Sequence, residues 1–237
     1  MNLAPSAIPK PASPDVCTAT VLVDGQPLPG SLGILSIVVS REVNRIPSAT
    51  LVVRDGEVAL QTFEVSNRDF FIPGKKIEIK LGYSSNEETV FKGIVVRHSV
   101  RIRTNTSFLT VECRDEAAKM AAGRKSRYYI DKKDSDIIEE IVGRYGLKKD
   151  VKTTKPALKE VVQYDATDWD FLVCRAEANG LLVMAEDGRI VVDAPDTQQK
   201  PVLALSFGAT IIELDAETDA RLQNPGIRAL SWSAADQ

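Results

Sequence analysis

The stretch Thr167–Gly180, TDWDFLVCRAEANG, predicts one short helix with a recognisable start and end. Thr167 is a favoured N-cap residue, and Asp170 follows three positions later, where its carboxylate can bond back to the cap. Apolar residues recur at helical spacing and share one face, and Gly180 supplies the left-handed backbone that stops a helix. The structural residues expected of this helix are Thr167, Trp169, Asp170, Leu172, Val173, Ala176 and Gly180.

The residues directly after this helix predict a β-hairpin. Leu181–Met184 and Arg189–Val192 are two apolar runs, and Glu186-Asp187-Gly188 between them is a turn signal. The expected arrangement is one helix held by the Trp169 indole against a hairpin.

The residues before this helix read as a β domain followed by helices. Lys76–Tyr83 alternates cleanly between apolar and charged side chains, which is typical of a half-buried strand. Several strands with short turns in about 100 residues predict an antiparallel barrel or a strongly curled sheet. Further strands are expected at 19–23, 32–39, 48–53, 89–96, 97–102, 107–113 and 161–164.

Two helices are expected after the β domain, at Glu116–Arg124 with Asp115 as its cap and at Ile137–Tyr145. The basic residues 124, 125 and 127 between them predict a solvated loop, with an acidic partner surface as the alternative. Towards the C-terminus, strands are expected at 202–207, 210–214 and 227–233. The fold class is therefore mainly β with α insertions.

Composition excludes several classes of function. The 237 residues carry a net charge of −3, so the chain lacks the basic excess of a general nucleic-acid binder. No apolar run approaches the roughly 20 residues of a membrane span, and residues 1–15, rich in Pro, Ala and Ser, predict a flexible arm without the apolar core of a secretory signal. Cys17, Cys113 and Cys174 lack metal-site spacing and are expected to be small buried side chains in a reducing compartment.

Acidic residues are the strongest candidates for chemistry, and they occur at the expected helix N-termini. One group lies within 131–140 and the other at Asp165, Asp168 and Asp170. Paired acids could serve a glycosidase or a metal site, but capping alone explains acids at these positions. His98, the single histidine, is expected to be a surface or core residue rather than a base. The sequence predicts no catalytic, cofactor-binding or metal-binding residue, and no enzyme.

The order and spacing of several motifs resemble the hub of contractile injection machines, namely the VgrG spike proteins of type VI secretion, the contractile phage tail hubs and the spikes of extracellular injection particles. The most specific part is Val162-Gln163-Tyr164, then Asp168–Leu172, then Arg175–Gly180. The other matching segments are residues 45–49, 55–56, 71–74, 77–83, 90–94, 113–115 and 135–147.

The resemblance implies two barrel-like hub domains in each subunit and a homotrimeric ring with a pseudo-sixfold outline. Such a ring would join a hexameric inner tube to a spike or OB-fold domain and would lie next to baseplate proteins. It would be assembled in the cytoplasm as part of a particle that can be released. The implied divisions are an arm at 1–15, a first β-barrel hub domain at 16–114, a helical insertion and connector at 115–159, and a helix, a hairpin and an incomplete second barrel at 160–237.

Two alternatives are kept beside the hub. One is a hydrolase of cell wall or glycan that uses acids such as Asp136. The other is a β-rich carbohydrate-binding module that uses Trp232 or Tyr128. Neither the particular machine nor its effector can be predicted from the residues.

Overall fold

The computed structural model divides the chain into two compact units, one formed by Asp15–Gln198 and the other by Met1–Pro14 with Gln199–Gln237. All named helices and strands belong to the larger unit. The residues that the structure describes are 16–56, 62–83, 86–103, 107–196, 198–201, 203–208, 210–211, 213–219, 226 and 228. The predicted N-terminal arm therefore lies outside the described residues.

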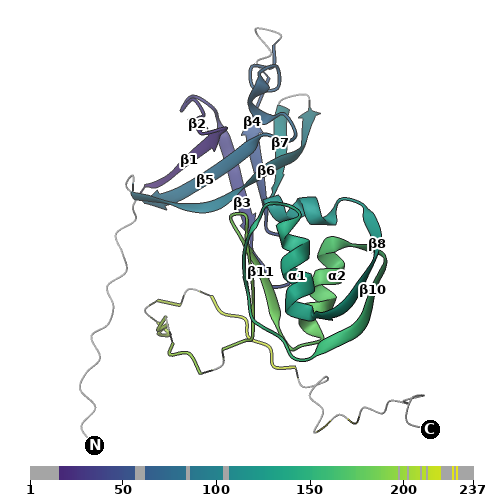
Figure 1. Ribbon diagram of the computed structural model, residues 1–237. Helices are drawn as coiled ribbons and strands as arrows, with labels where there is room; N and C mark the ends of the chain where they lie inside the picture. The colour runs from purple at the N-terminus through teal and green to yellow at the C-terminus, as the bar shows by residue number, and fades with distance from the viewer. Residues whose placement is uncertain are drawn as a thin grey trace, which may run out of the picture. The chain divides into compact units, whose positions relative to one another are not determined.

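The first half of the larger unit is one seven-stranded antiparallel sheet (Figure 1). Its order is β2-β1-β5-β6-β7-β4-β3, and the outermost strands are not paired with each other in the described residues, so the sheet is open rather than a closed barrel. The strands are β1 (Cys17–Val23), β2 (Gln26–Pro27), β3 (Ile34–Ser40), β4 (Ser48–Arg54), β5 (Lys76–Tyr83), β6 (Asn86–Ile102) and β7 (Ser107–Arg114).

The predicted alternation explains how this sheet forms its core. In β5, Ile77 and Ile79 are buried while the charged residues between and beside them are not. Val23 and Val21 of β1 face them in register, so cross-strand apolar pairs cover the same side of the sheet. The two strands expected at 89–96 and 97–102 are one strand, β6, because a register shift between Val95 and Arg97 bends the chain without ending it.

The second half packs two helices between two small sheets (Figure 1). Strands β8 and β10 form an antiparallel ribbon, and β11, β12 and β9 form a sheet in which β9 is parallel to β12. The elements of this half are η2 (Glu116–Ala121), β8 (Arg124–Lys133), α1 (Asp134–Gly143), β9 (Lys148–Val151), β10 (Ala157–Thr167), α2 (Asp168–Glu177), β11 (Leu182–Glu186) and β12 (Arg189–Asp193). The first half also contains the 3-10 helix η1 (Asp69–Phe71).

Two predictions for residues 115–135 were wrong. The segment expected to be an α-helix after Asp115 is the short 3-10 helix η2, although Asp115 does cap it by accepting a bond from the Ala117 amide (2.8 Å). The basic segment expected to be a solvated loop is strand β8. Its pairing with β10, about 30 residues later, overrides the local signal because each strand satisfies the backbone of the other.

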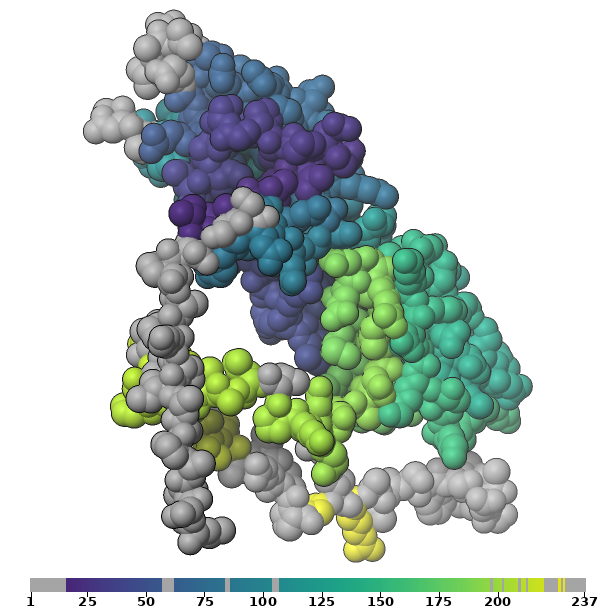
Figure 2. Space-filling view, turned by 90° about the vertical axis from the view of Figure 1, so that its left-hand side faces the viewer, coloured from purple at the N-terminus to yellow at the C-terminus, as the bar shows by residue number. Residues whose placement is uncertain are grey.

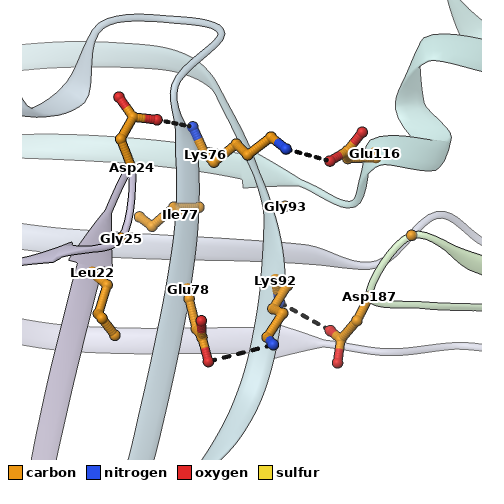
Figure 3. A pocket seen from close by; sticks show the side chains of 11 residues that line it. Leu22, Asp24, Gly25, Lys76, Ile77, Glu78, Lys92, Gly93, Glu116 and Asp187 are labelled. Carbon is orange, nitrogen blue, oxygen red and sulfur yellow. Dashed lines mark hydrogen bonds and ion pairs between the residues drawn. The ribbon is translucent and has the colours of Figure 1, made fainter.

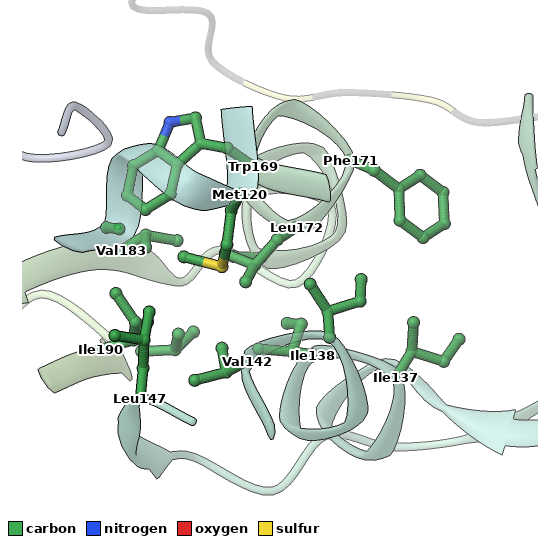
Figure 4. Close-up of a cluster of buried hydrophobic side chains, with 14 of the residues drawn as sticks. Met120, Ile137, Ile138, Val142, Leu147, Trp169, Phe171, Leu172, Val183 and Ile190 are labelled. Carbon is green, nitrogen blue, oxygen red and sulfur yellow. The ribbon is translucent and has the colours of Figure 1, made fainter. Parts of the chain in front are cut away.

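A separate apolar core holds the second half together (Figure 4). Trp169 and Leu172 point from α2 towards Val183 of the hairpin, while Ile138 and Val142 approach from α1. The predicted arrangement of helix, indole and hairpin is confirmed.

The C-terminal predictions are not matched by regular strands. Among the described residues of 202–214, the only pairing is an isolated bridge between Phe207 and Ile211. Phe207 is exposed, which leaves the strand pattern without a sheet to bury its apolar face. The segment expected at 227–233 lies outside the described residues apart from Arg228.

Candidate functional site

Helix α2 is built as the sequence indicates, and its residues serve the fold. The Thr167 hydroxyl caps the helix by accepting from the Asp170 amide (3.0 Å). Trp169, Leu172 and Ala176 are buried, Val173 is half-buried, and Gly180 has a positive φ of 67° after the helix. The structure thus places these residues in a core and at two helix ends.

Asp168, which the sequence assigned only to the helix end, is fully buried and is the centre of a polar network. Its carboxylate accepts hydrogen bonds from Lys125 Nζ (2.7 Å), the Tyr145 hydroxyl (2.7 Å) and Gln163 Nε2 (2.9 Å). Burial alone would raise the pKa of Asp168, but these hydrogen bonds and the nearby Arg144 outweigh it and hold that pKa below its ordinary value. The network therefore keeps a charged carboxylate in the interior and joins β8, the turn after α1, β10 and α2.

Asp134 at the start of α1 makes a second internal ion pair. Arg175 donates to it through two nitrogens, at 2.6 and 2.9 Å, and Asn179 Nδ2 donates at 2.8 Å. Burial opposes the charged form, but the bonds from Arg175 and Asn179 lower the pKa of Asp134. This bidentate contact ties the first turn of α1 to the last turn of α2.

These partners bear on the hydrolase alternative. Asp136 accepts from the Lys133 amide (3.4 Å), as expected of a capping residue, and Glu140 pairs with Lys132 (2.5 Å). None of the acids considered at 131–140 or 165–170 lines either pocket described below. Within the described part of the chain, no group of His, Cys, Asp and Glu side chains has the arrangement of a metal site.

Other candidate residues were found in different settings. His98, on β6, donates from Nδ1 to the Phe71 carbonyl (2.9 Å). Cys113 is buried, and burial raises the pKa of its thiol to about 12, but Cys17 and Cys174 are exposed, so the prediction of three buried cysteines was wrong for two of them. Trp232 lies outside the described residues.

A set of hydrogen bonds joins the hairpin to the large sheet and to the loops at its strand ends. The Asn44 amide donates to the Val183 carbonyl, and the Val183 amide donates back to Asn44 Oδ1, both at 2.8 Å. Asp187 in the hairpin turn accepts from the Lys92 amide (3.0 Å), and the Gly188 amide donates to Asp115 (3.0 Å). In Figure 2 the light-green hairpin surface lies against the indigo surface around β3. No local pattern indicates this junction, because its partners lie up to 139 residues apart.

A hollow of about 420 Å³ lies where this junction meets β1, β5 and β6 (Figure 3). Lys76 and Glu116 form an ion pair across it (3.9 Å), and Lys92 pairs with Glu78 (3.6 Å). A second hollow of about 380 Å³ lies beside Asn44 and Trp169. Four acidic and two basic side chains line the first hollow. Arg41 and Lys75, from outside the lining, pair with Asp187 and Asp24, so the charges there are balanced and favour neither an anion nor a cation.

The outer face of the β8–β10 ribbon is the other notable surface. Tyr128, Ile130, Val162 and Tyr164 are all exposed there. The sequence singled out Tyr128 only as a glycan contact and did not predict its neighbours, because the pairing of β8 with β10 brings them together.

The described helices include none long and apolar enough to cross a membrane.

The fold is shared with two tail proteins, one of them from a prophage, and with a type VI secretion component. A tail protein from Neisseria meningitidis MC58 superposes with a TM-score of 0.64 at 17% identity over 87% of this chain and 61% of its own. The 43 kDa tail protein of prophage MuSo2 from Shewanella oneidensis gives 0.56 at 16% identity, over 75% of this chain and 53% of its own.

The third structure is an Escherichia coli type VI secretion component described as similar to T4 bacteriophage tail proteins gp27 and gp5. It gives a TM-score of 0.53 at 14% identity, over 73% of this chain and 47% of its own. The chain thus spans about half to three fifths of the length of these structures. The expected fold class, mainly β with α insertions, and the likeness in fold to tail and VgrG-type proteins are confirmed, while the division into two barrel-like domains stays a prediction.

The family follows from the sequence model that matches residues 13–237, described as the Alg8 N-terminal domain. The chain belongs to this family. A comparison with curated proteins finds no match.

Proposed function

We propose that this protein is a structural hub of a contractile injection system, which forms a homotrimeric, pseudo-sixfold ring between a hexameric inner tube and a spike. The observation that carries the proposal is the shared fold with phage tail and type VI proteins, at a TM-score of up to 0.64 among the three compared. The contacts between Asn44 and Val183 support it, because a ring under load needs the two halves of each subunit to move together.

Symmetry gives the physical reason for such a ring. A threefold spike cannot present six identical contacts to a sixfold tube, but three copies with two β-rich halves each offer six similar surfaces. Strand edges are ready templates for main-chain pairing, and the large sheet ends in the edge strand β3. The partners in this proposal are the inner tube protein, a spike or OB-fold domain and baseplate proteins. The ring would assemble in the cytoplasm and become part of a particle that can be released. The proposed role involves neither nucleic acid nor a membrane span.

The proposal assigns no enzymatic activity to the described residues. The buried acids Asp134 and Asp168 are engaged by cations and amide donors inside the protein, so they are placed to stabilise the fold rather than to meet a substrate.

The proposal is tested by locating the chain in purified particles. A small tag at the N-terminus, visualised by gold labelling and electron microscopy, should appear at one end of the tube, and quantitative mass spectrometry should give three copies per particle end. Labelling along the whole tube, or six copies at its end, would refute the hub.

A further inference from the structure

One face of the large sheet carries an excess of arginine. In β4 and β7 the odd-numbered residues, such as Leu51 and Val111, are buried, so the even-numbered residues point to the opposite, outer face. Residues opposite each other in neighbouring strands share a face, which assigns the paired residues of β3 and β6 as well. We call the outer side of β3, β4, β7 and the part of β6 that pairs with β7 the arginine face. Its charged residues are Arg54, Arg97, Arg101, Arg114 and Glu112.

Three of the four arginines are available to a partner. Arg97 donates to Glu112, the single acid of the face. Arg54, Arg101 and Arg114 are exposed, and none of the three forms an ion pair with another described residue. Exposed guanidinium groups without a carboxylate beside them leave a positive potential over this face, although the chain as a whole carries a net charge of −3.

Glu112 shows which chemical group this face favours. Its pKa is lowered, chiefly by the hydrogen bond from Arg97 and further by the charges of Arg97 and Arg114. The face therefore favours the charged form of a carboxylate. Guanidinium groups match carboxylates because they donate two parallel N–H bonds, and arginine is enriched in interfaces between proteins.

The spacing of the arginines favours a protein partner over a nucleic acid. Arg54 and Arg101 lie opposite the two sides of Phe108, which places them two strands, or about 10 Å, apart. Arg54 lies six strand positions from the residue that pairs with Arg114, or about 20 Å along the sheet. A nucleic-acid strand carries one charge about every 3.4 Å, so most of its phosphates would meet uncharged side chains here. Carboxylates on a folded protein occur singly and can match such separated cations.

We propose that the arginine face binds an acidic protein surface, with single carboxylates of the partner pairing with Arg54, Arg101 and Arg114. The hydroxyl groups of Thr50 and Thr110, which lie between these arginines on the same face, supply further hydrogen bonds to the partner. The inference rests on the proposed hub, in which a neighbouring protein of the particle supplies the acids.

A fluorescently labelled octaglutamate peptide is the probe for the full chain. Eight extended residues span about 26 Å, which is enough to reach from Arg54 to Arg114. Fluorescence anisotropy at low ionic strength should show saturable binding that weakens as salt is added. Arg54→Gln and Arg101→Gln should each raise the Kd about threefold, and the double variant should raise it about tenfold. The matched control is Arg127→Gln, which removes an exposed arginine without an ion pair from β8 and should leave the Kd unchanged.

Chemical protection gives a second measurement that needs no variant. Phenylglyoxal modifies exposed arginines, and peptide mass spectrometry follows each site separately. At a peptide concentration of about twice the Kd, modification of Arg54 and Arg101 should slow about threefold, while that of Arg127 should not change. Circular dichroism verifies that each variant used for binding retains the fold.

The outcomes separate this inference from the hub itself. Absence of saturable binding up to about 1 mM peptide, or equal Kd values for the parent and the double variant, would overturn the arginine face as a binding surface. Tighter binding of an oligothymidylate of equal length through the same arginines would assign the face to nucleic acid and would also overturn the inference. Each of these results leaves the labelling test of the hub untouched.

Discussion

Replacement of Asp168 by asparagine removes one charge from the interior while nearly preserving shape. Asp168 is fully buried and accepts three hydrogen bonds, one of them from the Lys125 ammonium. The asparagine oxygen can still accept, but its amide places N–H groups against donors such as Gln163 Nε2. Loss of one partner of a buried ion pair costs about 3–5 kcal/mol.

The lower end of that range is expected here. The Lys125 side chain remains 30% exposed, so its ammonium can recover water when the carboxylate is lost. We therefore expect Asp168→Asn to lower the free energy of unfolding by about 3 kcal/mol. Urea denaturation followed by circular dichroism, with the m-value verified as unchanged, measures this directly.

A matched control lies three residues earlier. Asp165 forms an ion pair with Arg124, but both side chains are more than 60% exposed. Asp165→Asn should change the free energy of unfolding by less than about 0.5 kcal/mol. Equal effects of the two substitutions, or a loss below about 1 kcal/mol for Asp168→Asn, would refute the claim that a buried charge network holds this half together.

The pH dependence of stability tests the same network without a substitution. The folded-state pKa values of Asp168 and Asp134 are lowered. The stability that these two charged carboxylates contribute is therefore complete when the pH is above their unfolded-state pKa of about 3.9. It is lost as the pH falls through their folded-state pKa values. The free energy of unfolding should thus drop as the pH falls below about 4. The drop should be smaller in Asp168→Asn, and a drop of unchanged size would contradict the assignment.

Three further predictions concern packing, the junction and thiol access. Trp169→Ala should cost about 3–5 kcal/mol in urea denaturation because the indole is buried, and a cost below about 1 kcal/mol would contradict that burial. Asn44→Ala removes the acceptor of the Val183 amide and should speed its hydrogen exchange, with a loss of about 1–2 kcal/mol, whereas unchanged exchange would mean that the junction does not depend on Asn44. A thiol reagent should modify Cys174 in the folded chain but not Cys113, whose pKa of about 12 and burial suppress the thiolate, as peptide mass spectrometry would show.

Local signals in the sequence were sufficient wherever neighbouring residues decide the conformation. The cap at Thr167, the stop at Gly180 and the turn at Asp187 depend on residues a few positions apart, and all three are found in the structure. The alternation of Lys76–Tyr83 likewise predicted β5 with its own bounds.

The same local reasoning failed where a distant partner decides. Residues 124–133 carry a basic cluster typical of a loop, yet they form β8 because β10 is available to pair with them. Conversely, the described residues of 210–214 show only a bridge from Ile211 to Phe207, because a strand pattern needs a neighbouring strand to pair with.

The amino-acid order alone determined that this chain is mainly β, with a capped helix preceding a hairpin, since backbone preferences and side-chain periodicity act over a few residues. Only the tertiary structure decided that Asp168 is the buried partner of Lys125, that Asn44 fastens the hairpin to the large sheet, and that Tyr128 and Val162 share an exposed face. Each of these depends on residues brought together from 34 to 139 positions apart, and burial and charge pairing at such separations arise only when the whole chain has folded.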